Sequence, residues 1–236
     1  MLSSAMSSIA QDSNSIVTDR PTQSAASAVQ AKGDLLVEYG FVSEKAGDFT
    51  NITLANLLLR YGVIDGVEIR ITQNINQVSS DLDDSKVSGL SPLTIGTKVH
   101  LVEENGAVPQ ISVIGQVTLN NGEEAFKPGE TIPELRLNFS NTLSESLSLG
   151  YNLGMAFPQD NSQTFYTLVL GYAVSTGVTV FAEPYGFFQD GVSDHRFNTG
   201  VIYLAKENFQ LDLSGGFGLS DVSPDFFIGF GAAIGF

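Results

Sequence analysis

The sequence predicts an all-β fold: a single antiparallel up-and-down transmembrane β-barrel of about 12 strands. Three observations lead to this prediction. From residue 33 onward the chain divides into segments of strand length bounded by turn residues, apolar and polar residues alternate within these segments, and short and long connections tend to alternate between them. One apolar face, one polar face and this regular connectivity are typical of a barrel whose strands cross a membrane.

The predicted strands follow one another without an intervening helix, because helical periodicity is not sustained anywhere in the chain. Their residue ranges are 34–44, 51–62, 66–78, 93–103, 108–120, 132–142, 146–157, 163–174, 177–189, 195–205, 208–219 and 225–236.

Alternation within individual strands supports the barrel. The strand at 66–78 contains VEIRITQNI, in which most alternate residues are apolar and the residues between them are charged or polar. The strands at 132–142 and 208–219 contain PELRLNFS and FQLDLSGGFGL, with the same alternation. The polar face repeatedly carries glycines and opposed charges, while the other face stays apolar from end to end. Lipid outside and a polar lumen inside explain both properties.

The last predicted strand, FFIGFGAAIGF, contains no charged residue. A helix is disfavoured there because Gly229, Gly231 and Gly235 would each cost about 1 kcal/mol relative to alanine. In a strand, most of the large residues face lipid and these glycines face a crowded interior. Pairing with the first strand would leave no open edge in hydrocarbon. The terminal Phe236 resembles the C-terminal aromatic signal that the outer-membrane assembly machinery recognises, so that machinery is an expected partner.

The connections predict the orientation of the barrel. If the strands run up and down, every second connection lies at the same end. One end then carries short turns and the other carries longer, acidic loops around Asp83, Glu124 and Asp190. Barrels of the bacterial outer membrane have short periplasmic turns and longer extracellular loops. We therefore expect both termini in the periplasm and the acidic loops outside. The apolar faces of the strands are expected to contact outer-membrane lipid.

Composition excludes several other classes. The net charge of -15 would repel a phosphate backbone, so nucleic acid is not an expected partner. The absence of cysteine excludes thiolate metal sites and thiol catalysis. Charged residues make up 16% of the chain, fewer than the roughly 25% of an ordinary soluble domain. No apolar run is long enough for a transmembrane helix.

The N-terminal residues divide into two parts ahead of the barrel, which occupies 33–236. Residues 1–10, with SSIA before Gln11, resemble the end of an export signal, and a disordered polar terminus is the alternative. Residues 11–32 either trail in the periplasm or fold into the lumen as a small plug. In the second case Asp19 and Arg20 are placed to pair with luminal charges.

Several stretches of the chain resemble one family. The segments TDRPTQS, LLLRYGVIDGVEIRI, IGTKVHLVEENGAVPQISVIGQVTLNNG, LSLGYNLG, VTVFAEPYGFF and NFQLDLSGGFGL are similar, in this order, to the bacterial outer-membrane "transporter" proteins of the MetA-pathway of phenol degradation type. The resemblance covers 18–236. It implies an outer-membrane β-barrel and a transport function, with small aromatic compounds among the candidate solutes.

Ionisable residues on the polar face are the candidate site. One hypothesis is a lining that selects solutes, because rings of charged side chains determine what a pore admits. The other is an internal salt-bridge network that fills a narrow barrel and keeps it closed. The predicted luminal residues are Glu38, Arg60, Glu68, Arg70, Lys98, His100, Glu134, Arg136, Glu183 and Asp212.

Catalysis, metal binding and cofactors are not expected. A hydrolase of this architecture needs a serine and a histidine that meet on the outer face. His100 is predicted in the lumen and His195 in a loop, and no G-x-S-x-G turn is present. The acidic cluster at Asp81, Asp83 and Asp84 lacks the spacing of a calcium loop, so a solvated loop is the simpler interpretation.

The predicted function is therefore passive uptake of small solutes, aromatic or hydrophobic ones among them, through a barrel in the bacterial outer membrane. The alternative is a closed structural or interaction barrel in an envelope complex, whose lumen is filled by salt bridges. A soluble lipocalin-like binder is the third possibility. A requirement for detergent would distinguish it from the first two.

Overall fold

The computed structural model describes residues 15–236, so the export-signal remnant expected at 1–10 lies outside the described residues. The described chain forms thirteen strands and one short 3-10 helix, η1 (Glu124–Phe126). The strands are β1 (Leu35–Ala46), β2 (Phe49–Ile64), β3 (Val67–Ser80), β4 (Lys86–Leu90), β5 (Thr94–Val102), β6 (Gln110–Thr118), β7 (Ile132–Thr142), β8 (Leu147–Ala156), β9 (Gln163–Ser175), β10 (Val178–Gln189), β11 (Val192–Lys206), β12 (Phe209–Gly218) and β13 (Phe226–Gly235).

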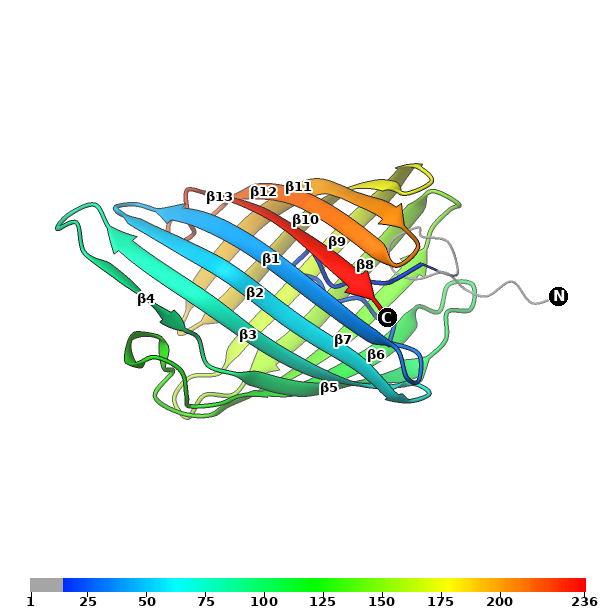
Figure 1. The fold of residues 1–236 in the computed structure, drawn as a ribbon, viewed down its shortest axis with the longest axis horizontal. Coiled ribbons are helices and arrows are strands. Elements are labelled where there is room, and N and C mark those ends of the chain that lie inside the picture. The colour runs from blue at the N-terminus through cyan, green and yellow to red at the C-terminus, as the bar shows by residue number, and fades with distance from the viewer. Residues whose placement is uncertain (1–14) are drawn as a thin grey trace.

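The strands close into one antiparallel barrel (Figure 1). Apart from β4 and β5, each strand pairs with its neighbours in sequence, and β1 pairs with both β2 and β13, which joins the two ends of the sheet. β4 and β5 pair with successive parts of β3 and together occupy one strand position in the barrel. The thirteen strands therefore fill twelve strand positions. The predicted all-β barrel of about 12 strands is confirmed.

The connections at the two ends differ, and two of the predicted boundaries need correction. The end that holds the C-terminus is called the near end below, and the opposite end is called the far end. The longest connection between strands at the near end is 103–109, whereas the far end has the longer connection 119–131. The stretch 79–92, expected outside the strands, instead extends β3 and forms β4. Residues 192–194, also expected in a loop, belong to β11. Main-chain pairing continues beyond the apolar belt, where alternation no longer indicates a strand.

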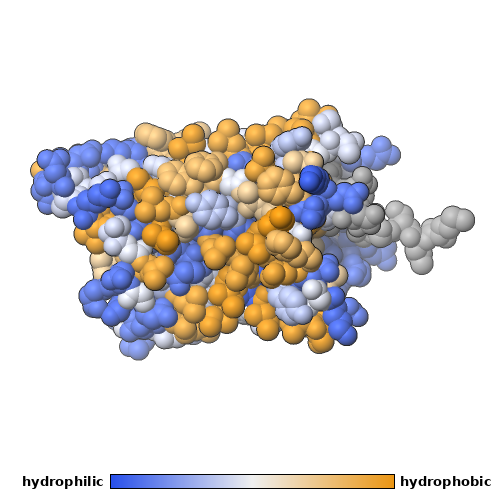
Figure 2. Space-filling view, in the orientation of Figure 1, coloured by the Kyte–Doolittle hydropathy of each residue, from blue (hydrophilic) through white to orange (hydrophobic). Residues whose placement is uncertain are grey.

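The outer surface carries a continuous apolar belt. Figure 2 shows hydrophobic residues across the middle of the visible face and hydrophilic residues towards both ends. Leu137 and Leu213 project outward and are exposed in the isolated chain. Aromatic pairs reinforce neighbouring strands on this surface, with Phe41 and Phe230 stacked at 5.0 Å between ring centroids. Among the described residues, no helix is long and apolar enough to cross a membrane.

The described N-terminal residues, 15–32, run inside the barrel as an extended segment, called the luminal segment below (Figure 1). Its start is tied to the near end, where the Ile16 amide donates to the Glu207 carbonyl at 2.9 Å. The segment then fills the middle of the lumen and leaves again at the near end, where Lys32 bridges to Gly62. The polar interior of the barrel is therefore occupied by the protein's own chain.

The glycine face of β13 makes room for this segment. Gly231 pairs with Gly40 of β1, and the Arg20 guanidinium lies over both, so close that a Cβ at either position would overlap it. A Cβ at Gly235 would lie 2.6 Å from the side chain of Ile16. The bare inner face that the sequence predicts for the last strand is thus complementary to particular side chains of the luminal segment.

Candidate functional site in the lumen

All ten ionisable residues singled out from the sequence lie on the inner side of their strands. Glu38, Arg60, Glu68, Lys98 and Glu183 are completely buried. The remaining five are largely buried or half-buried, and they are Arg70, His100, Glu134, Arg136 and Asp212.

Five of these residues meet in one charge cluster on β1, β2, β3 and β5. Arg60 binds Glu68 through two parallel hydrogen bonds of 2.9 Å, and its third nitrogen lies 3.3 Å from Glu38. Arg70 and Lys98 also approach Glu68, at 2.9 and 3.6 Å. The strand register produces this meeting because Arg60 lies opposite Arg70 on β3, and Glu68 lies opposite Lys98 on β5.

Asp19 of the luminal segment completes the cluster. Its carboxylate lies 2.7 Å from Arg70 and 3.4 Å from both Arg60 and Lys98. Burial alone would raise the pKa of Asp19, but the three cations hold that pKa well below its usual range. The cluster then contains three carboxylates (Asp19, Glu38 and Glu68) and three cations. This balance offsets the cost of burying each charge.

Arg20 makes a second, separate ion pair. Its guanidinium lies 2.8 Å from Asp212 of β12, and both side chains are almost entirely buried. The two adjacent residues Asp19 and Arg20 therefore bind different strands of the inner wall. The pairing of these two residues with luminal charges, which the sequence suggested, is present in the structure.

The wall also binds the backbone of the luminal segment. Glu38 accepts hydrogen bonds from the amides of Asp19 and Arg20, and Glu183 accepts from the amides of Gln23 and Ser24. Carboxylates that accept backbone N–H groups satisfy donors that would otherwise be buried without partners. Two of the predicted luminal acids therefore act as anchors for a peptide chain.

Uncharged wall residues also bind the luminal segment. The Asn152 side chain both accepts from the Ala25 amide and donates to the Ala25 carbonyl, at 2.7 and 3.0 Å. Ser24 binds Thr167, and Ser27 binds Ser140. These residues are not among the predicted luminal residues, which are all ionisable groups on the inner face. Their inward positions in the alternation are the signal that would have identified them.

The other five predicted residues lie outside the charge cluster, and two of them, Asp212 and Glu183, bind the luminal segment. Arg136 pairs with Glu134 at 3.2 Å, and its guanidinium lies 4.5 Å from the centre of the Phe165 ring. His100 lies 3.1 Å from Glu103 at the near end. The candidate lining is therefore divided into separate groups rather than forming one continuous ladder of charges.

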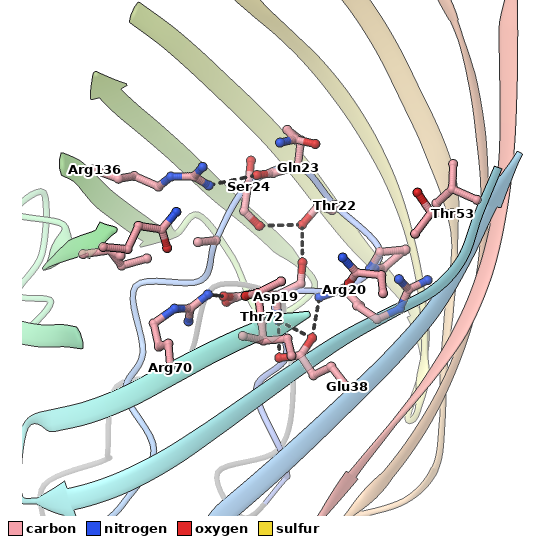
Figure 3. Close-up of a pocket in the computed structure, with 17 residues that line it drawn as sticks. Asp19, Arg20, Thr22, Gln23, Ser24, Glu38, Thr53, Arg70, Thr72 and Arg136 are labelled. Carbon is pink, nitrogen blue, oxygen red and sulfur yellow. Dashed lines mark hydrogen bonds and ion pairs between the residues drawn. The ribbon is translucent and has the colours of Figure 1, made fainter. Parts of the chain in front are cut away.

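Two cavities lie in the lumen on the far side of the luminal segment. The inner cavity has a volume of about 320 Å³ and is lined by the segment itself together with wall residues that include Arg70, Gln116 and Arg136 (Figure 3). The outer cavity has a volume of about 590 Å³ and lies between the far ends of β9, β10 and β11. Its lining includes Phe187 and Arg196.

Neither histidine joins the charge cluster. His195 lies in β11 and not in the loop expected from the sequence, and its Nδ1 is 3.2 Å from the Tyr166 hydroxyl. Within residues 15–236, no group of three or more His, Cys, Asp or Glu side chains is placed to hold a metal ion.

A closed antiparallel barrel with an apolar outer belt and a polar, filled interior is the architecture of outer-membrane β-barrels, and this chain is one. The chain belongs to the family described as "Putative MetA-pathway of phenol degradation", which matches residues 18–236. This confirms the resemblance found in the sequence.

Solved structures with the same fold include outer-membrane porins and channels. The NanC porin is 7% identical, with a TM-score of 0.61 over 85% of this chain and 98% of that chain. The KdgM porin in complex with disordered oligogalacturonate is 13% identical, with a TM-score of 0.58 over 85% and 99%. The CymD monoaromatic hydrocarbon channel is 8% identical, with a TM-score of 0.51 over 88% and 90%. No curated protein matches the chain.

Proposed function

We propose that this barrel is a passive channel for the uptake of small solutes across the bacterial outer membrane, with the luminal segment as the part that closes it. The observation that carries this proposal is the way the segment is held. It crosses the lumen as a single extended chain, bound by hydrogen bonds and ion pairs such as those of Ser24 and Asp19. Two cavities already lie on its far side.

The charge cluster supports a second candidate, a closed structural barrel. Its three carboxylates and three cations balance one another, and Arg60 and Lys98 have no contact with solvent. Breaking a buried pair by removing one partner typically costs about 3–5 kcal/mol, so such a cluster resists opening. In this case the barrel would act as an interaction partner in an envelope complex and would not conduct.

The remaining assignments follow from the channel proposal. Residues 1–10 belong to an export signal, the luminal segment closes the channel and 33–236 form the barrel. The chain is delivered to the outer-membrane assembly machinery through Phe236 and has no catalytic activity. The far end, with its acidic loops, faces outward.

Planar-bilayer recordings of two matched variants test the channel. Ser24 donates to Glu183, which is completely buried, so Ser24→Asp would place a second carboxylate against it and expel the segment. Gln23→Glu adds the same charge one residue away, at an exposed position. We expect discrete openings that become larger or more frequent in Ser24→Asp and stay near the original level in Gln23→Glu. If the unchanged protein and both variants show no openings, the closed barrel is favoured.

A further inference from the structure

Aromatic rings lie along one side of the outer cavity. Phe187 and Phe165 are called the aromatic floor below. Phe187 points inward from β10 and lies opposite Phe165 of β9 and Asp194 of β11 in the strand register. Its ring contacts Phe165 at 6.2 Å and Tyr185 at 5.9 Å between centroids, the second contact being edge-on. These two neighbours position the Phe187 ring, the guanidinium of Arg196 lies 5.9 Å from its centre, and the ring lines the cavity.

This floor continues towards the inner cavity. Arg136, Gly154, Phe165 and Phe187 occupy one row across four adjacent strands, all facing inward. A Cβ at Gly154 would lie only 2.1 Å from the Phe165 ring, so the missing side chain is what allows this ring to lie against the guanidinium of Arg136. Since Arg136 lines the inner cavity, the two phenylalanines connect the boundaries of both cavities.

Polar groups surround the aromatic floor. Two amide side chains, Gln163 and Gln189, line the outer cavity and are bonded to each other at 3.1 Å. An apolar ring face with hydrogen-bonding groups at its edge is the usual composition of a site for a small cyclic ligand. Val192 and Val222 complete the apolar part of the lining.

The charges of the outer cavity disfavour an anion. Its one guanidinium, Arg196, is bound by Asp194 at 2.6 Å and by Glu44 at 2.9 Å, and Asp190 adds a further carboxylate to the lining. The carboxylates therefore outnumber the cation that could attract a negatively charged group. A carboxylate on the ligand would meet like charges as it entered, which opposes binding.

We propose that the outer cavity is a binding site for a neutral six-membered ring that carries hydroxyl groups, stacked on Phe187, with its hydroxyls bonded by Gln163 and Gln189. This inference rests on the proposed function, because it identifies the class of solute that the channel captures first. A phenol and a hexose share this chemistry: each offers a face that packs on an aromatic ring and hydroxyls that bond amides.

Ligand-observed saturation-transfer NMR on the full chain in detergent tests the site, with phenol, glucose and benzoate as probes and empty micelles as the blank. We expect phenol, glucose or both to bind, and to bind at least about tenfold more tightly than benzoate. Phe187→Leu should weaken ring binding roughly two- to tenfold, the range expected for loss of one aromatic contact. Phe187→Tyr keeps the ring and should retain binding.

A neighbouring phenylalanine provides the matched control. Phe188 is the next residue, points to the lipid face and is exposed, so Phe188→Leu removes a ring of the same kind from the other side of the wall and should leave binding unchanged. Equal effects of Phe187→Leu and Phe188→Leu would overturn the site, as would absence of binding by both neutral probes. Thermal melting in detergent confirms that each variant is folded.

A second variant tests the charge argument. Asp190 has a φ of 53°, a conformation that asparagine tolerates, so Asp190→Asn removes one carboxylate from the lining without straining the turn. Benzoate binding should improve several-fold relative to phenol. Tighter binding of benzoate than of phenol by the unchanged protein would contradict the inference. These binding measurements do not depend on transport. If the barrel conducts but binds neither neutral probe, the binding site is refuted and the channel is not. If it binds a neutral probe but never conducts, the channel is refuted and the binding site is not.

Discussion

Single glycines on the inner wall determine where large side chains lie in this lumen. Gly40 and Gly231 form a bare patch beneath the Arg20 guanidinium, and Gly154 forms another beneath the Phe165 ring. Neither patch lies at a turn. A methyl group added at any of these positions would overlap the side chain that covers it, so that side chain would have to move.

Replacing Gly154 with alanine tests this argument. The Phe165 ring is buried and held by Arg136 and Phe187, so it has little room to withdraw from the new Cβ. We expect Gly154→Ala to lower the free energy of unfolding by roughly 1–3 kcal/mol, as overpacking does. Gly115→Ala is the control, because its Cβ would meet nothing within 4 Å. A urea titration in detergent that gave equal stabilities for both variants would contradict the proposed role of Gly154.

At the scale of the strand, the alternation of residues has a physical cause that makes it readable from sequence. Lipid on one side and a polar lumen on the other impose opposite demands on successive residues, so the inward positions of Arg60, Glu68 and Lys98 follow from their neighbours alone. Beyond the apolar belt this contrast disappears. For this reason β4 and the first residues of β11 were not recognised as strands, although their main chains remain paired.

The luminal segment was less predictable than the wall. Its anchors join residues far apart in sequence, for example Ser24 with Glu183, and several of them bind backbone rather than side chains. A backbone amide leaves no mark in the sequence. The charged pair Asp19 and Arg20 was visible as a candidate, but the structure was needed to show that each binds a different part of the wall.

A lipid-facing substitution tests the orientation of strand β7. Leu137 points outward near the middle of the strand, so Leu137→Arg should cost roughly 2–4 kcal/mol, the penalty for a charge in the bilayer core. Gln116→Arg on β6 is the luminal control, because Gln116 lines the inner cavity and lies opposite Glu134 in the register, where a new cation gains a partner. Similar costs in a refolding titration into lipid vesicles would argue against lipid on the Leu137 side.

At the scale of the whole molecule, the two ends of the barrel have different compositions and connections. The far end holds the longest connection, 119–131, with Glu123, Glu124 and Glu130, and the connection 81–85 with three aspartates. The near end holds the C-terminus and the point where the luminal segment joins β1. If the segment closes the channel, the side from which it enters decides which compartment can influence it. Orientation in the membrane therefore determines how closure is controlled.

Epitope tags inserted at the two ends test that orientation. A tag in 119–131, a connection outside the paired strands, should be labelled on intact cells because short turns face the periplasm and longer loops face outward in barrels of this class. A tag in 143–146, a near-end turn, should be labelled only after the outer membrane is permeabilised. Both insertions lie outside the strands, so neither should disturb the pairing of the wall. The reverse pattern would place the acidic loops in the periplasm, and the outer cavity with Phe187 would then be the exit of the channel instead of its entrance.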